Sequence, residues 1–342
     1  MLSVVDTFQK VFLTAGYKKY PASLIFPCLD PTTLFTSATI SVLKNHLLAG
    51  AAQKVFVIQP CLRTQNLKQS FCRDFDPEYL SSFVMFGILC SVGEFNLECI
   101  YAFFDSFPGL TKKILMRSSK IIGNEFFRQI GQQYLIEYDT RDPCYYKWQY
   151  GNDSLSGIGS TFAIEQPDGD FLDVGNLVLI HKHGKPIAME FGFGMETFIA
   201  RMTGRKSPYA ASQEYLRLGL GLSNTGKRIG DCLIVALKLF EHGVIPGTGK
   251  ASSIMRKALR NTCFLVIKDY GSVATEKFYH ISRQASANPL WLKLTGRTYG
   301  EVQTAISAFT RETTHIKKHA SGYRLEQKIR EYRLQYGIPE QF

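Results

Sequence analysis

At 342 residues the chain can bury a sizeable core, and chains of this size usually hold two domains or one large domain with an appendage. With 45% hydrophobic and 20% charged residues, it has the composition of a globular protein, which excludes an intrinsically disordered chain. Its 40 Lys and Arg residues outnumber its 29 Asp and Glu residues, and the net charge of +11 permits an anionic partner such as RNA without proving one.

The first half of the chain alternates helix and strand signals. Leu2–Ala15 carries apolar residues at helical spacing, and Gly16 stops the pattern as a C-cap does. The next segments are assigned from the same periodicities and from the turn residues between them. We expect a turn at Asp30–Thr32, a strand at Thr33–Thr36, a helix at Ile40–Leu48, strands at Val55–Arg63 and Phe83–Val92 around a polar loop at Thr64–Tyr79, a helix at Asn96–Phe107, a basic helix at Lys112–Gln133 and a strand at Tyr134–Tyr138.

The clearest local pattern is a β-hairpin. Leu177–Ile180 and Ile187–Glu190 are apolar, and His183–Pro186 between them has turn chemistry, which predicts two antiparallel strands. Two glycines then follow, Gly192 and Gly194. Glycine lets the backbone approach another element or a ligand closely.

Beyond the helix expected at Met195–Met202, strand signals vanish. The composition shifts near Thr203–Pro208, so we place a boundary there between an α+β domain, 1–205, and an all-helical domain, 206–342. Within the second domain we expect helices at Asp231–Glu241, Ser252–Thr262, Gly300–Thr310 and Arg324–Leu334.

Neither a membrane segment nor a metal site is indicated. The longest apolar runs are shorter than the roughly 20 residues that span a bilayer, and Asp6 interrupts the apolar start before a signal peptide could form. The eight cysteines form no C-x-x-C pair, and the pairs His181/His183 and His315/His319 have no third ligand nearby. We expect a cytoplasmic protein with reduced cysteines and no metal.

A set of short runs matches a known pattern in order and in register. Asp30–Thr36 reads D-P-T-T-L-F-T, Gln59–Arg63 reads Q-P-C-L-R and Phe83–Gly87 reads F-V-M-F-G. The other runs are Trp148–Gly151, Val174–Val178, Glu190–Glu196, His242–Pro246, Ile254–Arg260 and Tyr336–Pro339. Together they resemble the catalytic module of the alanyl-tRNA synthetases, which are class II aminoacyl-tRNA synthetases, over essentially the whole chain.

The resemblance implies a fold and partners. It implies a six- or seven-stranded antiparallel sheet flanked by helices, with the active site on the open sheet face, followed by an all-helical domain of the type that binds the tRNA acceptor stem. The family's editing domain and oligomerising tail have no match in the 342 residues, so we expect a stand-alone homologue. Its partners would be a small amino acid and tRNA or aminoacyl-tRNA.

The resemblance also implies the roles of site residues. Arg63 would clamp the substrate carboxylate and the α-phosphate, as a bidentate guanidinium can. Trp148 would wall the pocket, Asn176 would orient the substrate and Gly192 would leave room for it. Glu190 would face the α-ammonium where the family has Asp, and an opposite charge there favours the ammonium form.

Four further residues complete this expectation. Ile40 and Val178 would line the amino-acid pocket, and Met85 and Gly194 would join Arg63 at the nucleotide. We expect a small substrate, alanine first. Glycine and serine stay open, because one methylene changes affinity by only roughly 1–3 kcal/mol.

The nucleotide side departs from the family. Thr197 stands where an Arg should meet adenine and the γ-phosphate, Val84 replaces a Glu that accepts from adenine, and Ser154–Thr161 replaces a loop with an acidic residue near the metal. Our hypothesis is therefore that the protein takes an aminoacyl group from aminoacyl-tRNA and passes it to a small-molecule amine in specialised metabolism, without making an adenylate. ATP and Mg²⁺ would be its cofactors only under the first alternative below.

Two alternatives stay open. One is a minimal ATP- and Mg²⁺-dependent alanine-activating ligase, in which Arg201 or Arg205 replaces the missing Arg. The other is a non-catalytic tRNA-binding or regulatory protein.

The basic residues Arg256, Lys257 and Arg260 coincide with the family's acceptor-stem domain and suit RNA phosphates, but they would also suit a solvated helix surface. The basic run Lys112–Lys120 has the same two interpretations. Thr248 and Leu334 stand at the places of the family's acceptor-stem readers, which leaves the choice of tRNA open.

Overall fold

The computed structural model describes residues 3–22, 25–26, 33–49, 54–72, 74–110, 113–130, 136–150 and 155–340. The chain divides into two compact units, one of Met1–Arg63 with Ser82–Ser212 and one of Thr64–Ser81 with Gln213–Phe342. The second unit thus includes a segment that the sequence analysis assigns to the first domain. The turn expected at Asp30–Thr32 lies outside the described residues.

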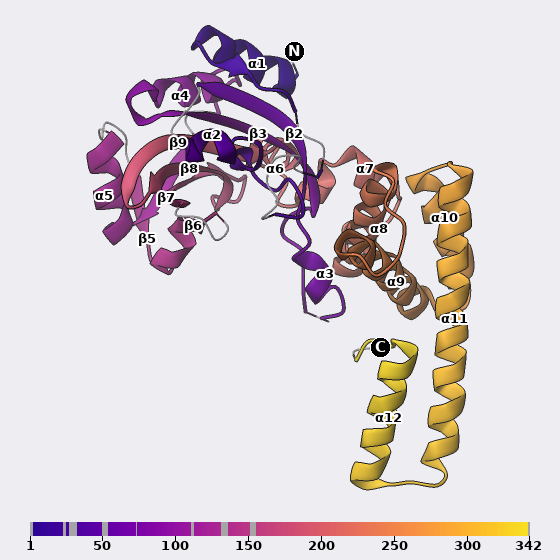
Figure 1. Cartoon of the computed structure of the whole chain (residues 1–342). Helices are drawn as coiled ribbons and strands as arrows, with labels where there is room; N and C mark the ends of the chain where they lie inside the picture. Colours follow the sequence, from indigo (N-terminus) through magenta and orange to yellow (C-terminus); the bar gives the residue numbers. More distant parts are fainter. Residues whose placement is uncertain are drawn as a thin grey trace. The chain divides into compact units, whose positions relative to one another are not determined.

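The first unit is built on one sheet (Figure 1). Its described strands run in the order β1-β2-β3-β9-β8-β7-β4-β5, with β6 paired to β7. All neighbours are antiparallel except β1 with β2 and β4 with β5, which lie at the two edges. The strands are β1 (Lys18–Lys19), β2 (Val55–Leu62), β3 (Ser82–Ser91), β4 (Ile114–Ser119), β5 (Ile136–Asp139), β6 (Lys147–Gln149), β7 (Leu155–Glu165), β8 (Phe171–Lys182) and β9 (Lys185–Gly194).

Helices of this unit cover the sheet, so the expected α+β architecture is confirmed. The sheet has more strands than the six or seven expected, because short strands extend both of its edges. The helices and 3-10 turns are α1 (Val4–Thr14), η1 (Thr39–Val42), α2 (Lys44–Leu48), η2 (Val92–Glu94), α4 (Glu98–Asp105), α5 (Lys120–Ile130), η4 (Pro143–Tyr146), α6 (Met195–Met202) and η5 (Pro208–Ala210).

The predicted hairpin is confirmed as β8 and β9. Its turn residues His183 and Gly184 both have positive φ, 49° and 75°. Two successive left-handed residues make the turn whose twist matches the flanking strands.

One face of the sheet carries an aromatic core under α1, α4 and α6 (Figure 1). Phe193 of β9 stacks on Phe86 of β3 at 5.3 Å between ring centroids, and it also meets Phe103 of α4 and Phe198 of α6 at 5.5 and 5.1 Å. Phe8 of α1 closes the group against Phe86 at 4.9 Å. Burying each such ring contributes roughly 1.5–3 kcal/mol, so this face holds the helices on the sheet.

Two expected elements differ from the structure. Lys112–Gln133 is not one helix, because Ile114–Ser119 pairs with β7 and β5 as β4, and only Lys120–Ile130 is helical. Sheet pairing decides such a segment over its local propensity. Thr33–Thr36 forms no strand: Thr36 has single backbone bonds to Ile25 and Leu62 instead of a ladder.

The second unit contains only helices among its described residues. In Figure 1 the long helix α11 is followed by α12, which runs back along it. None of the described helices is both long and apolar enough to cross a membrane. The elements are α3 (Asn66–Gln69), α7 (Gln213–Leu216), α8 (Asn224–Glu241), α9 (Lys250–Tyr270), η6 (Gly271–Val273), α10 (Ala274–Ala285), α11 (Pro289–Lys317) and α12 (Gly322–Tyr336).

The segment Thr64–Ser81 is held in this unit by a buried carboxylate of α8. Asp231 is 3% exposed and accepts from the backbone N–H of Ser81 at 2.8 Å, from the hydroxyl of Ser81 at 2.5 Å and from the amide of Asn66 at 3.1 Å. Because Asn66 and Ser81 lie near the two ends of the segment, one side chain of α8 ties both ends together.

Candidate functional site

The predicted residues of β9 share the sheet face that lies opposite the aromatic core. Side chains alternate along a strand. Phe191 and Phe193 point into the core, so Glu190, Gly192 and Gly194 face the other way.

The neighbouring strands add three more predicted residues to this face. Glu190 is opposite Val178 of β8, Gly192 is opposite Asn176, and Gly194 is opposite Met85 of β3. Directly opposite residues in antiparallel strands have Cβ atoms about 4.5–5.5 Å apart. The fold therefore brings together six residues that were predicted from separate sequence runs: Met85, Asn176, Val178, Glu190, Gly192 and Gly194.

Trp148 and Ile40 form an apolar wall beside these residues. Trp148 of β6 pairs with Gly157 of β7 and is partly buried against a cluster that includes Ile40, Val178 and Leu155. Gly151, the last residue of the run that contains Trp148, lies outside the described residues.

Glu190 is buried, with 6% of its surface exposed, and its carboxylate already has two neutral donors. The backbone N–H of Ile40 donates to Oε1 at 3.1 Å, and the hydroxyl of Tyr150 donates to Oε2 at 3.0 Å. Burial raises the pKa of Glu190, while Tyr150, the backbone of Ile40, the side chain of Thr39 and the charge of Arg63 oppose the rise. A buried carboxylate in a partly apolar setting is suited to a cation.

Tyr150 was missed as a site residue. Its phenol stays protonated, because burial and then the charge of Glu190 raise its pKa well above the ordinary value. Its side chain lies beside Gly157, where an added Cβ would come within 3.3 Å of the Tyr150 Cε2 and hydroxyl oxygen and 2.5 Å from Val178 Cγ1. The available signal was a departure from the family run W-Q-M-G, in which Tyr150 stands where the family has Met.

Thr39 is a second residue that sequence reasoning missed. A Cβ added to Gly87 would lie 1.9 Å from its Oγ1, and a Cβ added to Gly192 would lie 2.9 Å from the same atom. These two glycines therefore seat Thr39 on the sheet. The resemblance assigns the space over Gly192 to a substrate. In this structure the Thr39 hydroxyl lies at that space.

Arg63 follows β2 and lies at the edge of the site. Its Nε and Nη2 donate to the carbonyl oxygen of Ser37 at 3.1 and 2.8 Å, and its guanidinium lies over the ring of Phe83 at 5.0 Å. Its positive charge opposes the rise in the pKa of Glu190 that burial causes, so the two side chains interact electrostatically. The fork of Arg63 thus contacts a backbone carbonyl here.

Two polar side chains of β2 lie between Arg63 and the glycines. Burial raises the pKa of the Cys61 thiol to about 12, Arg63 opposes this, and the charges of Glu196 and Glu190 add to it. Gln59 is 1% exposed and donates to the carbonyl oxygen of Ala38 at 3.0 Å. Its Oε1 is buried and accepts from no group in the described part of the chain.

On the nucleotide side, three charged side chains bind backbone groups of the same unit. Glu196 accepts from the backbone N–H of Val84 at 3.1 Å, beyond the end of β9. Arg201 is 5% exposed and donates to the carbonyl oxygens of Arg205 and Lys206. Arg205 donates to the carbonyl oxygen of Ala210 at 2.7 Å. Both arginines that could replace the missing Arg therefore donate to backbone carbonyl groups of the segment that follows α6.

The basic residues of α9 differ from one another. Arg256 and Lys257 are exposed. Arg260 is half-buried, donates to the carbonyl oxygens of Tyr336 and Gly337 at 3.2 Å each, and so ties α9 to the end of α12.

One residue of the basic run in the first unit is engaged in an ion pair. Arg117 of β4 pairs with Glu137 of β5 at 2.7 Å. Lys112 of the same run lies outside the described residues. Arg117 thus lies on a strand and not on a solvated helix surface, whereas Lys120, the last residue of the run, is exposed at the start of α5.

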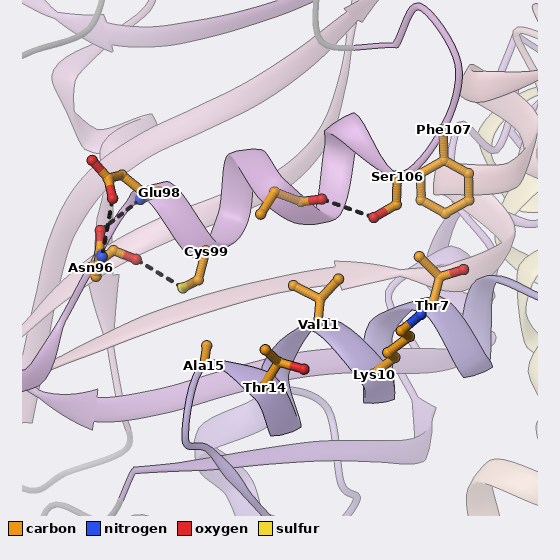
Figure 2. A pocket seen from close by; sticks show the side chains of 11 residues that line it. Thr7, Lys10, Val11, Thr14, Ala15, Asn96, Glu98, Cys99, Ser106 and Phe107 are labelled. Atoms are coloured by element: carbon orange, nitrogen blue, oxygen red, sulfur yellow. Dashed lines mark hydrogen bonds between the residues drawn. The ribbon is translucent and has the colours of Figure 1, made fainter.

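A pocket of about 610 Å³ opens elsewhere, between α1 and α4. Figure 2 shows Val11 and Thr14 of α1 facing Cys99 of α4 across it. None of the predicted site residues lines it, and α1 and α4 cover the aromatic face of the sheet.

Comparisons with known proteins give structural likeness only. No protein-family model matches the chain, and a search among curated proteins finds no match. Similar solved structures include asparaginyl-tRNA synthetase from Pyrococcus horikoshii complexed with asparaginyl-adenylate (12% identity, TM-score 0.36), pyrrolysyl-tRNA synthetase from Desulfitobacterium hafniense (9%, 0.35) and a Leishmania major protein assigned as an aspartyl-tRNA synthetase (10%, 0.38).

These neighbours are class II aminoacyl-tRNA synthetases. Each match covers 61% of this chain and, respectively, 65%, 71% and 62% of the other chain, so the first and third are matched over less than two thirds of their length.

Proposed function

We propose that this chain is an alanyl-tRNA synthetase-like protein that binds a small amino acid, alanine first, as an aminoacyl group and does not make an adenylate. The observation that carries the proposal is the buried carboxylate of Glu190, with Gly192 and Asn176 on the same sheet face and the apolar side chains of Trp148 and Ile40 beside it.

This arrangement suits an α-ammonium on a short side chain. A buried carboxylate is stabilised by a cation more than by neutral donors. The apolar wall of Trp148, Ile40 and Val178 favours a methyl group, and Thr39 over Gly192 limits its size. Discrimination among alanine, glycine and serine rests on such contacts and is worth roughly 1–3 kcal/mol.

Contacts on the nucleotide side support the absence of adenylate chemistry. Arg201 and Arg205 are engaged with backbone carbonyl oxygens, and the side chain of Val84 offers adenine no acceptor. Thr197 has no positive charge for a γ-phosphate. Each missing charged contact would cost about 1.5–3 kcal/mol of nucleotide affinity.

The reaction we propose is aminoacyl transfer from aminoacyl-tRNA to an amine. The amine nitrogen attacks the ester carbonyl carbon, a C–N bond forms, and the C–O bond to the ribose oxygen breaks. The proton lost by the amine goes to that oxygen, which leaves an amide and uncharged tRNA. Glu190 would hold the aminoacyl ammonium, and Arg63 would meet negative charge on the ester oxygen. Arg256 and Lys257 would hold RNA phosphates.

Transfer from charged tRNA tests this function. Labelled alanyl-tRNA is mixed with hydroxylamine as a small amine probe, with and without the protein, and the hydroxamate is measured. We expect a rate above the uncatalysed reaction that falls in R63A and E190Q. A rate equal to the uncatalysed one, with tRNA bound, would favour the non-catalytic alternative. Alanine-dependent pyrophosphate exchange would favour ATP-dependent activation instead.

A further inference from the structure

The phenol of Tyr150 and the carboxylate of Glu190 form a contact that synthetase chemistry does not need. Tyr150 donates to Oε2 at 3.0 Å, and the ring fits over Gly157. It belongs to a run that resembles W-Q-M-G, where the family's Met cannot donate a hydrogen bond. This chain therefore supplies its own donor to the carboxylate.

The two donors of Glu190 are not equivalent. The donor to Oε1 is the backbone N–H of Ile40, which belongs to η1 and is fixed by the seating of Thr39 against Gly87. The donor to Oε2 is a side-chain hydroxyl, which can leave by a rotation of the Tyr150 side chain. Of the two, the phenol is the one that a ligand can replace without moving the backbone.

Neutral and charged donors also differ in strength. A carboxylate already strengthens the hydrogen bond that it accepts from a neutral phenol, and an ammonium adds the attraction between opposite charges, which is weakly screened at a buried site. An ammonium can displace a phenol from a buried carboxylate, whereas a neutral amide or hydroxyl of the same size gains nothing by the exchange.

We infer that the Tyr150 hydroxyl occupies the position of the ligand's ammonium on Glu190, so that ligands bind by displacing it and Tyr150 selects cationic ligands over neutral ones. This inference rests on the proposed function and makes Tyr150 a specificity-determining residue of the same site. It also accounts for the burial of this carboxylate, because among the described residues the Tyr150 hydroxyl and the backbone N–H of Ile40 both donate to it.

The test uses two small probes and three variants of the full chain. L-alaninamide carries the ammonium, and isobutyramide replaces it with a methyl group at the same size. Y150F removes the competing hydroxyl. Y146F is the matched control, because Tyr146 is also buried and also donates to a carboxylate, that of Asp139 at 2.6 Å. E190Q removes the charge that the ligand needs.

We expect Y150F to bind L-alaninamide about tenfold more tightly than the unmodified protein, the factor that one hydrogen bond to a charged group is worth. Y146F should leave the affinity unchanged, E190Q should lose binding, and isobutyramide should not bind the unmodified protein. Calorimetric titration measures each affinity, and circular dichroism shows whether each variant is folded.

The outcomes separate the two proposals. L-alaninamide binding that is equal or weaker in folded Y150F overturns the role of Tyr150 and leaves the proposed function standing. If no variant binds L-alaninamide at millimolar concentration, both are overturned. An equal increase in the affinity of Y146F for L-alaninamide would show that removing any buried tyrosine hydroxyl has this effect. That result would also overturn the inference.

Discussion

The backbone N–H of Ile40 donates to the carboxylate of Glu190 at 3.1 Å, although 150 residues separate them in the chain. This bond ties η1 to β9 over the sheet face that carries the candidate site. Thr39, the neighbour of Ile40, packs against Gly87 and Gly192 of the two adjacent strands. The position of η1 thus depends on a carboxylate and two glycines.

Replacing Gly87 with alanine should displace η1. The added Cβ would lie 1.9 Å from Thr39 Oγ1, and overpacking of this kind costs about 1–3 kcal/mol. Urea unfolding measures the loss. G93A is the control, because a Cβ at Gly93 meets nothing within 4 Å. In a T39G background the cost of G87A should shrink, and an undiminished cost would show that Thr39 is not what Gly87 accommodates.

The stability difference between E190Q and the unmodified protein should depend on pH. Burial raises the folded pKa of Glu190 above its usual 4.5. The carboxyl group therefore adds to the free energy of unfolding at pH values below its usual pKa. This contribution is lost as the pH rises through the folded pKa. Glutamine does not titrate. The free energy of unfolding of E190Q should therefore rise relative to that of the unmodified protein as the pH increases from about 4.5.

Urea unfolding at several pH values measures this trend. The same substitution at the exposed Glu326 should show no such gain. A free energy of unfolding of E190Q that falls with rising pH relative to that of the unmodified protein would contradict the raised pKa.

Removing the carboxylate of Asp231 should loosen the segment Thr64–Ser81. D231A leaves three donors from Ser81 and Asn66 without their acceptor, and each unsatisfied buried donor costs about 1–3 kcal/mol. We expect faster hydrogen exchange in this segment and a lower midpoint of urea unfolding. D269A, at an exposed position of α9, is the control. Unchanged exchange in D231A would mean that other contacts hold the segment.

Charge reversal on α9 tests RNA binding. R256E with K257E should weaken binding of an RNA acceptor helix and reduce the slope of log affinity against log salt by about 2, because each phosphate contact contributes about 0.9 to that slope. K317E with K318E reverses another exposed pair of lysines and should change the slope less. Equal effects of the two double variants would indicate general electrostatic attraction.

The sequence predicts much of this fold because its strand signals are local. The hairpin of β8 and β9 follows from two apolar runs around His183 and Gly184, and the alternation of β9 already assigns Glu190 and Gly192 to the face opposite Phe191. Strand β4 escaped prediction, since its pairing with β7 and β5 depends on segments far along the chain.

The contacts inside the candidate site could not be predicted in the same way. Tyr150 follows the short strand β6 and Thr39 begins the short turn η1, and their positions depend on which glycines of the sheet leave space for them. Gly87, Gly157 and Gly192 look interchangeable in the sequence. Only the strand register shows that two of them seat Thr39 and that one lies under Tyr150.

The most direct test of the central claim is a parallel calorimetric titration of the full chain with ATP plus Mg²⁺ and with L-alaninamide, each repeated with E190Q. We predict that L-alaninamide binds the unmodified protein and not E190Q, and that ATP gives no binding at micromolar concentration. Micromolar ATP binding, or L-alaninamide binding that survives in E190Q, would contradict a site that holds an aminoacyl group through Glu190 without adenylate chemistry.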